Sequence, residues 1–171
     1  MPISVDTLKA NLGSVAKIFL WDVQIPNPVG GGDPTTINLR AQSSQIPGRS
    51  VSVIEIPYKQ GANLQFIGKL KYDHTWTCEF LEGEDRATFD WIYAWCQQMV
   101  NDDSNLSEGE GGGRTDLYLT LVTTGNDVYN KIRMKDCFIE SVGAVALQYS
   151  DETTPIKFSV QFRYNSWEYV S

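Results

Sequence analysis

Residues 46–80 have the sequence IPGRSVSVIEIPYKQGANLQFIGKLKYDHTWTCEF, and this stretch indicates the fold most directly. Two strand-like runs, 49–58 and 63–71, are joined by a short turn and predict a long β-hairpin over about 49–71. A third run, 72–80, alternates polar residues with Tyr72, His74, Trp76, Cys78 and Phe80. This period of two is typical of a strand with one face in a core.

The first strand of the hairpin has an irregular pattern. Val51 and Val53 alternate on one face, whereas Ile54 and Ile56 fall on the other, and Pro57 lacks a backbone donor. Such a strand suits a sheet edge or an arm better than the centre of a sheet. An apolar hairpin that fits its own domain poorly indicates a partner elsewhere, and the simplest partner is another copy of the chain.

The composition points to one packed domain. The chain has 171 residues, near the usual size of a single domain, so we expect one domain over 1–171. Hydrophobic residues make up 42% and aromatic residues 12% of the chain, which argues against disorder and favours an aromatic-rich β fold. The net charge is −7, from 14 basic and 21 acidic residues. Tight nucleic-acid binding needs clustered basic residues, so this balance argues against it.

The rest of the chain predicts strands and one helix. Residues 84–100 place apolar side chains three and four positions apart, which predicts a helix with a buried stripe of Phe89, Ile92, Tyr93, Cys96, Met99 and Val100. Trp91 and Trp95 lie on the flank of this stripe, where we expect core or subunit contacts rather than a ligand platform. Residues 5–12 are expected to form a short helix or an arm. Strands are expected over 16–25, 35–43, 116–123, 128–134, 137–142 (after a bulge), 144–149 and 156–164, the last central in its sheet. We therefore expect a mainly β fold, an antiparallel β-sandwich or barrel with one flanking helix.

The sequence predicts neither a metal site nor a cofactor nor an enzyme. Cys78, Cys96 and Cys137 lack the spacing of zinc ligands, and we expect them to be reduced and buried. His74, the only histidine, alternates with apolar residues, which favours packing over catalysis. Asp73 and Glu79 share a predicted strand face but lie ~20 Å apart, too far for a carboxylate pair in one active site.

Two further segments bear on ligands and location. Residues 101–115, NDDSNLSEGEGGGRT, are acidic and glycine-rich, but their spacing does not match a calcium-binding EF-hand loop, and we expect a solvated loop. The N-terminus has no basic region followed by an apolar run, and no segment reaches ~18 consecutive apolar residues. We therefore expect synthesis in the cytoplasm and no membrane insertion.

The order of these motifs resembles the tail tube proteins of contractile-tailed bacteriophages. IPGRSV, IPYKQGANLQFIGK and YDHTWTCEF are followed by FDWIYAW in the predicted helix and by FSVQFRYNSWEYV at the end. The resemblance covers roughly the whole chain. It implies six-membered rings whose inner sheets join into one β-barrel and which stack into a hollow tube inside a sheath. It also implies a virion component made in the host cytoplasm, with sheath, baseplate and tail-terminator proteins as partners and DNA passing through without specific binding.

Under this resemblance the hairpin is an arm that contacts the next ring, and the expected contacts are Arg49, Val51, Val53, Ile54, Ile56, Tyr58, Lys59, Phe66 and Lys69. Asp73 and Glu79 are candidates for the lumen by alternation alone, which leaves the helix or solvent as alternatives. One other hypothesis is the related inner tube of a type VI secretion system or a phage-like injection particle, whose cargo is protein. Another is a monomeric β-sandwich that binds carbohydrate, which predicts exposed aromatic residues near a groove and no self-assembly.

Overall fold

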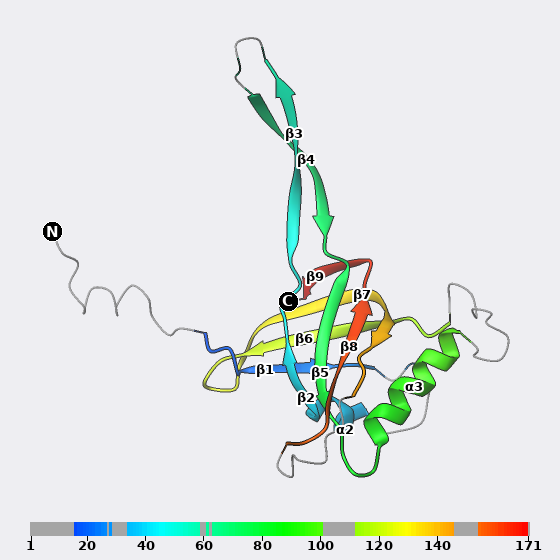
Figure 1. The fold of residues 1–171 in the computed structure, drawn as a ribbon. Helices are drawn as coiled ribbons and strands as arrows, with labels where there is room; N and C mark the ends of the chain where they lie inside the picture. The colour runs from blue at the N-terminus through cyan, green and yellow to red at the C-terminus, as the bar shows by residue number, and fades with distance from the viewer. Residues whose placement is uncertain are drawn as a thin grey trace.

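The computed structural model describes residues 16–26, 28, 34–58, 61, 63–100, 112–145 and 154–170. Two antiparallel sheets packed on each other make up the body, and a two-stranded hairpin projects from one end of it (Figure 1). The fold is mainly β with one long helix, which confirms the predicted fold class. In the described part of the chain, neither helix is long and apolar enough to cross a membrane.

The two sheets share one long strand, β7. Sheet A consists of β1 (Trp21–Gln24), β6 (Thr115–Val122), the first half of β7 (Val128–Val142) and β9 (Ser166–Val170). Sheet B consists of β2 (Ala41–Ser44), β5 (Thr75–Leu81), β8 (Lys157–Arg163) and the second half of β7. β7 passes from one sheet to the other near Asp136, whose φ is 59°, and its pairing with β6 shifts register there. This irregularity confirms the predicted bulge between 128–134 and 137–142.

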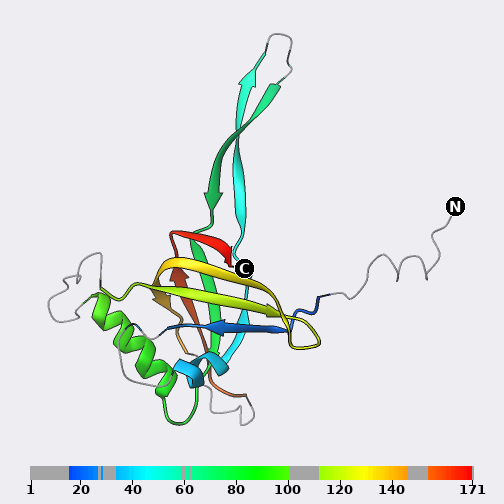
Figure 2. The same cartoon turned by 180° about the vertical axis from the view of Figure 1, so that it is seen from behind.

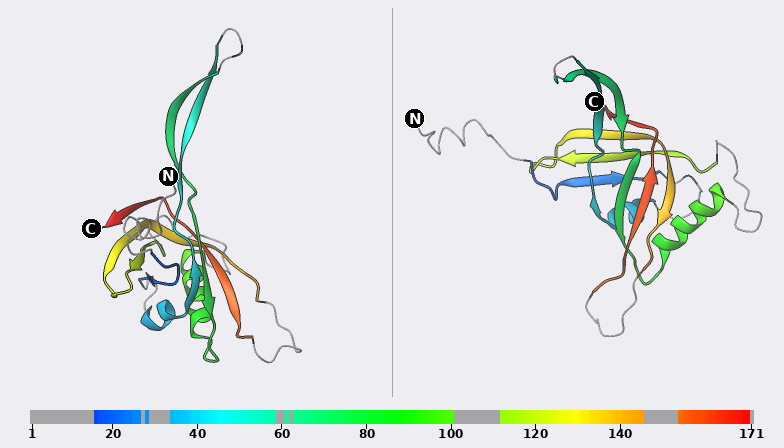
Figure 3. Two further views of the ribbon diagram at one scale, coloured as in Figure 1. Left: turned by 90° about the vertical axis from the view of Figure 1, so that its left-hand side faces the viewer. Right: turned by 45° about the horizontal axis from the view of Figure 1, so that its top comes forward.

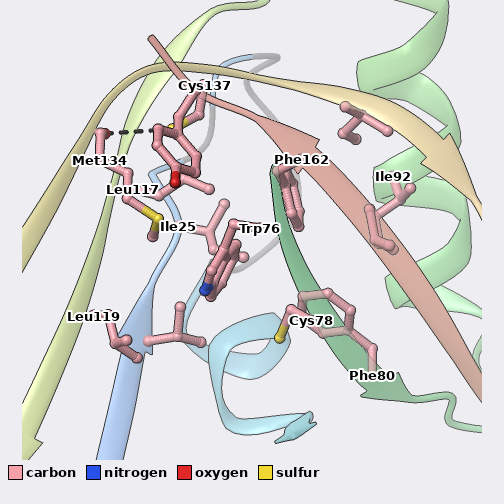
Figure 4. Packing of buried hydrophobic residues seen from close by; sticks show 14 of the residues in the cluster. Ile25, Trp76, Cys78, Phe80, Ile92, Leu117, Leu119, Met134, Cys137 and Phe162 are labelled. Atoms are coloured by element: carbon pink, nitrogen blue, oxygen red, sulfur yellow. Dashed lines mark hydrogen bonds between the residues drawn. The ribbon is translucent and has the colours of Figure 1, made fainter. Parts of the chain in front are cut away.

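Alternating side chains of the central strands fill the space between the sheets. β8 lies between β7 and β5, so its predicted central position is confirmed. Its Phe158 and Phe162 are buried and pack against Phe80 and Trp76 of β5, with 5.4 Å between the ring centroids of Trp76 and Phe162 (Figure 4). Burying a side chain of this kind stabilises the fold by about 1.5–3 kcal/mol before entropy is counted. The core therefore rests on the strands with the clearest alternation.

The helix α3 (Ala87–Met99) covers one side of this core. Its buried residues are Thr88, Trp91, Ile92 and Trp95, and the Trp95 ring lies 5.7 Å from that of Phe162. Both tryptophans are buried, which confirms that they pack in the core, although they lie within the buried face of α3 and not on its flank. The Trp91 ring packs against the Trp95 ring at 5.4 Å. Of the residues predicted for that stripe, Tyr93 is 49% and Val100 41% exposed.

α3 begins three residues after the predicted start, and a carboxylate outside the helix caps it. Oε2 of Glu82 accepts a hydrogen bond from the N–H of Phe89 at 2.7 Å. Arg40 lies 3.5 Å from Glu82 and 2.8 Å from Asp85, and its hydrogen bond lowers the pKa of Asp85. Negative charge at a helix N-terminus is stabilising. Glu82 supplies it, whereas the side chain of the N-cap residue, Arg86, makes no capping hydrogen bond.

The segment 35–43, predicted as a strand, is a short helix followed by a strand. α2 (Pro34–Leu39) begins at a proline, whose fixed φ suits the first turn of a helix. Its Asn38 accepts a hydrogen bond from the N–H of Ile25 at 3.0 Å, which joins α2 to the end of β1. The alternation of Ile37 and Leu39 is therefore not that of a strand, since Ile37 is buried and Leu39 is 76% exposed.

Other predicted strands differ in extent. The segment 16–25 contributes only β1, because residues 17–20 form a turn that leaves Phe19 67% exposed. The segment 156–164 is β8, and a separate strand, β9, follows it. Residues 143–145 are not a strand. The rest of the predicted 144–149 strand, the 5–12 element and nearly all of the 101–115 loop lie outside the described residues.

Candidate functional site: the arm, the polar face and the open edges

Among the described residues, β3 (Arg49–Pro57) and β4 (Asn63–Tyr72) pair only with each other, and we call residues 49–72 the arm. The arm leaves the body from one end in every view (Figures 1 and 3). A two-stranded hairpin is at best marginally stable alone in water. The arm nevertheless carries large apolar side chains that are 47–88% exposed, namely Val51, Val53, Ile54, Ile56, Tyr58, Leu64, Phe66, Ile67 and Leu70. Patches of this kind mark interaction surfaces.

The structure places the apolar contact residues expected from the sequence on the surface of the arm, and it adds three. Leu64, Ile67 and Leu70 lie opposite Ile56, Val53 and Val51 on the neighbouring strand. These three residues can be found by taking the cross-strand neighbour of each predicted contact residue, because directly opposite side chains lie on the same face of a hairpin. Lys69 takes part in the arm through its backbone, whose N–H donates to Oγ of Ser52 at 2.7 Å. Lys59 lies outside the described residues.

Trp167 of β9 fixes the root of the arm to the body. Its Nε1 donates a hydrogen bond to the carbonyl oxygen of Gly48 at 3.2 Å. The Arg49 guanidinium lies 5.4 Å from the centroid of the Trp167 ring, and Tyr72 packs edge-on against the same ring at 6.4 Å. Arg49 therefore contacts its own body, and its expected contact with another ring stays a prediction.

The strand predicted over 72–80 is interrupted at this root. β4 ends at Tyr72 and β5 begins at Thr75, and His74 between them has a φ of 57°. His74 is exposed, and its Nδ1 lies 3.0 Å from the carbonyl oxygen of Tyr164. Because the chain turns here, the expectation that Asp73 and Glu79 share one strand face is wrong. Asp73 lies at the root of the arm, and Glu79 lies within β5.

The outward face of sheet B is polar, and we call it the polar face. Its central positions are Ser43, Thr75, Thr77, Glu79, Ser141, Ser159 and Gln161. Oγ of Ser43 donates a hydrogen bond to Glu79 at 3.3 Å. At one end of the face, Arg163 forms an ion pair with Glu140 at 2.7 Å, and Lys157 lies at the other end. Two carboxylates and two cations leave this face without net charge.

Sheet B has an open edge on each side. β2 is the last strand in the order of the sheet, with β5 as its only partner. At the other side, residues 138–142 of β7 pair with β8 alone, because the pairing with β6 ends at Cys137. Among the described residues, no strand covers either edge. The unpaired backbone groups of such edges are templates for pairing with another chain.

Ligand chemistry is sparse in the described residues. No group of three His, Cys, Asp or Glu side chains lies close enough together there to bind a metal ion. An apolar depression of about 270 Å³ lies between β1 and β2, and among its described lining residues only Lys17 is charged. The three cysteines form no disulfide with one another, and burial raises the thiol pKa of both Cys78 and Cys137 to about 12. Cys96 is half-buried, so the expectation of full burial does not hold for it.

Four of the five tryptophans, Trp76, Trp91, Trp95 and Trp167, are buried. A carbohydrate-binding module predicts exposed aromatic residues along a groove, whereas a tube subunit predicts them in the core or between copies. The position of these four rings favours the tube subunit.

Residues 20–170 match the model of a protein family described as phage tail tube protein. None of the curated protein sequences compared with the chain matches it significantly. Solved structures with a similar fold include a chain of the PVC sheath–tube complex of an extracellular contractile injection system in the extended state, with 10% identity, 99% of both chains covered and a TM-score of 0.63.

A second is the tube-terminating cap of the anti-feeding prophage, with 11% identity, 100% of this chain and 96% of that chain covered and a TM-score of 0.67. A third is a chain of the PVC sheath/tube terminator, with 13% identity, 94% and 99% covered and a TM-score of 0.63. At these identities the likeness shows a shared fold. The family match extends over nearly the whole of the two sheets and the arm, and the chain therefore belongs to the phage tail tube protein family, as a structural subunit of a tail tube.

Proposed function

We propose that six copies of the chain form a ring in which the two open edges of sheet B meet. β2 of one copy pairs with residues 138–142 of β7 in the next copy, so that six sheets join into one closed barrel. Closure pairs every edge of sheet B and removes the aggregation hazard that open edges present. The number six comes from the resemblance to contractile tail tubes. The presence of an open edge on each side of one sheet is the observation that carries the proposal.

In this ring the polar face lines the lumen. Hydroxyl and amide side chains dominate it, and Glu79 and Glu140 contribute two carboxylates for each copy, balanced by Arg163 and Lys157. Six copies carry 6 × −7 = −42 charges, which repel DNA at long range, while the balanced polar face offers no cluster of cations to hold phosphate. DNA thus passes without specific binding. Asp73, the other lumen candidate, lies at the root of the arm and outside this face.

The arm extends from the ring to the next ring. It leaves the body from one end (Figure 3). Its exposed apolar side chains become buried when another molecule binds them. Burying half-exposed side chains of this size contributes about 25 cal/mol for each Å² removed from water. Stacking of rings through the arm therefore produces a hollow tube.

The names of the similar structures support the further partners. They describe a sheath–tube complex, a sheath/tube terminator and a tube-terminating cap. We infer that this chain likewise assembles with a sheath protein and a terminator, and the resemblance adds a baseplate. The assembled chain then belongs to the tail of a virion, after synthesis in the host cytoplasm.

A second candidate function is supported by the same names. The PVC complex is described as an extracellular contractile injection system, and the family match to phage tail tubes does not state the cargo. In that case the polar face conducts protein rather than DNA. A hydroxyl-rich lumen without net charge suits either cargo, so the test is whether particles isolated with this tube contain DNA.

Negative-stain electron microscopy of the purified protein at high concentration tests the assembly. We expect rings or hollow tubes with six-fold symmetry. Replacing Ile54 and Ile56 by Asp is expected to abolish stacking and to leave the body folded, because both side chains lie on the arm and outside the core. Replacing Ser50 by Ala, also on the arm, is the matched control and is expected to stack normally. Tubes of normal length from the Ile54→Asp, Ile56→Asp variant contradict the role of the arm.

A further inference from the structure

The arm changes its apolar face halfway along its length. Directly opposite residues lie on the same face of a hairpin, and successive residues point to opposite faces. Near the root, the pairs Val51–Leu70 and Val53–Ile67 lie on the face of the odd-numbered β3 residues. Near the tip, the pairs Ile54–Phe66 and Ile56–Leu64 lie on the other face. Neither face of the ribbon is apolar from end to end.

The polar residues of the arm change face in the opposite sense. Ser50 pairs with Lys71 near the root, on the face that is apolar at the tip. Glu55 pairs with Gln65 near the tip, on the face that is apolar at the root, and the Glu55 carboxylate accepts a hydrogen bond from Asn63 at 2.8 Å. The odd face is thus apolar near the root and polar near the tip. The even face is polar near the root and apolar near the tip.

The twist of the ribbon compensates for this change. β3 and β4 exchange sides between the body and the tip (Figures 1 and 2), as expected for a two-stranded ribbon, which twists more strongly than a broad sheet. Because the two strands cross between the body and the tip, the odd face at the root and the even face at the tip lie on the same side of the arm (Figures 1 and 2). The apolar pairs nearest the root and the tip, Val51–Leu70 and Ile56–Leu64, therefore lie on one side of the arm, and the polar pairs lie on the other. The adjacent pairs Val53–Ile67 and Ile54–Phe66, at the change of face, still point to opposite faces.

A bulge lies at the change of face and increases the local twist. The register of the two strands shifts between Val51 and Val53, opposite an extra residue in β4. Oγ of Ser52 accepts from the N–H of Lys69 at 2.7 Å and donates to its carbonyl oxygen at 3.1 Å. Only glycine fits at position 68, because a Cβ there would lie 2.4 Å from Oγ and 2.7 Å from the carbonyl oxygen of Ser52.

We propose that the twist and the Ser52–Gly68 bulge bring the apolar pairs of the root and of the tip onto one side of the arm, which we call the strip, and that the body of a second copy of this chain covers that strip. The proposal rests on the function proposed above and specifies which side of the arm forms the contact. Residues 49–71 contain four basic residues and one acidic residue, a net charge of +3, and the other residues contain ten basic and twenty acidic residues, a net charge of −10. The arm of one copy is therefore attracted to the body of another.

Thiol labelling before and after assembly distinguishes a one-sided strip from a contact that follows the two faces. The four test variants are Val51→Cys, Leu64→Cys, Ser50→Cys and Gln65→Cys, each made in a Cys96→Ser background that leaves only the buried Cys78 and Cys137. A maleimide probe is applied to the free protein and to assembled tubes. We expect assembly to slow the labelling of the Val51 and Leu64 variants by about tenfold or more, since interface cores exclude water. The Ser50 and Gln65 variants are expected to label as in the free protein.

Other labelling patterns overturn the proposal. Protection of the Val51 and Gln65 variants together, or of the Ser50 and Leu64 variants together, shows that one face of the ribbon forms the contact. Protection of all four shows that the arm is enclosed on both sides. A chain that forms no rings or tubes under any condition contradicts the proposed function itself and with it the second copy as partner, so the two failures are distinguishable.

The bulge is tested separately by Gly68→Ala, with Ser50→Ala as the control. The added methyl group forces Ser52 and Gly68 apart and reduces the local twist. We expect rings that still form, an unchanged melting temperature of the body and a several-fold higher protein concentration for stacking, measured by sedimentation. Stacking of Gly68→Ala at the concentration of the control shows that the bulge is not required and contradicts this part of the proposal.

Discussion

The body and the arm are built from the same kind of strand, yet the apolar residues of the body are buried and those of the arm are exposed. In β5 and β8, alternation is regular, and every second side chain is buried within the same chain. In β3 and β4, the alternation shifts by one residue partway along, and no core covers either strand. The difference shows that a broken pattern in an apolar strand does not indicate disorder. In this chain it accompanies a strand whose apolar side chains stay exposed on its own fold.

The largest difference between the two regions is expected for phenylalanine truncation. Phe162 is fully buried between Trp76 and Trp95, whereas Phe66 on the arm is 51% exposed. Phe162→Ala is expected to lower the free energy of unfolding of the monomer by about 3–5 kcal/mol, and Phe66→Ala by less than about 1 kcal/mol. Denaturant unfolding monitored by tryptophan fluorescence measures both. Equal losses in the two variants contradict the division between body and arm.

A smaller effect is expected at the joint between the regions. Trp167→Phe keeps a ring beneath Arg49 but removes the hydrogen bond to Gly48. We expect a loss of about 1 kcal/mol in unfolding free energy, together with faster amide exchange at the root of the arm. Tyr169→Phe, which changes a 57% exposed ring on the same strand, is the control. If exchange at the root is unchanged in Trp167→Phe, Trp167 does not hold the arm.

The smallest expected effect concerns acid sensitivity of the body. Burial raises the pKa of Asp116, but hydrogen bonds from the Asp136 N–H at 3.0 Å and the Arg133 guanidinium at 2.8 Å outweigh burial and hold this pKa below its usual value. A depressed carboxyl pKa stabilises the fold above the unfolded-state pKa of about 3.9, and this stabilisation is lost as pH falls through the lower folded-state pKa.

Asp116→Asn is therefore expected to cost less than about 1 kcal/mol at neutral pH, as is usual for a partly exposed ion pair. The difference in unfolding free energy between the two proteins is expected to narrow as the pH falls from about 5 to about 2. Urea unfolding at several pH values measures it. A difference that stays constant or widens on acidification shows that the Asp116 carboxylate does not stabilise the folded state.

The sequence predicted the elements whose side chains report burial directly. β8, β5 and the arm were recognisable because period-two alternation and turn residues are local signals. The short α2 was missed because Ile37 and Leu39 alternate as they would in a strand, and its position depends on the contact of Asn38 with Ile25. The extent of the buried stripe on α3 also depended on tertiary packing, since the space beside Phe162 accommodates the indole rings.

The candidate surfaces were predictable only in part. The apolar arm residues followed from composition, but Leu64, Ile67 and Leu70 required the register of β3 and β4. Likewise, Glu79 was assigned to a face by alternation, while the left-handed backbone at His74 separated Asp73 from it. Strand order fixes the polar face and the open edges, and strand order is a property of long-range pairing that local patterns do not encode.

The arm projects from one end of the body only, and this gives any stack of copies a direction. A contact between an arm and the body of another copy joins two unlike surfaces, and such a contact repeats without closing. The two ends of the resulting filament are different. A new copy binds through its arm at one end and through its body at the other, and these two reactions have separate rates. Nothing in a repeating contact counts the copies, and the length of the filament must be set by a molecule other than this chain.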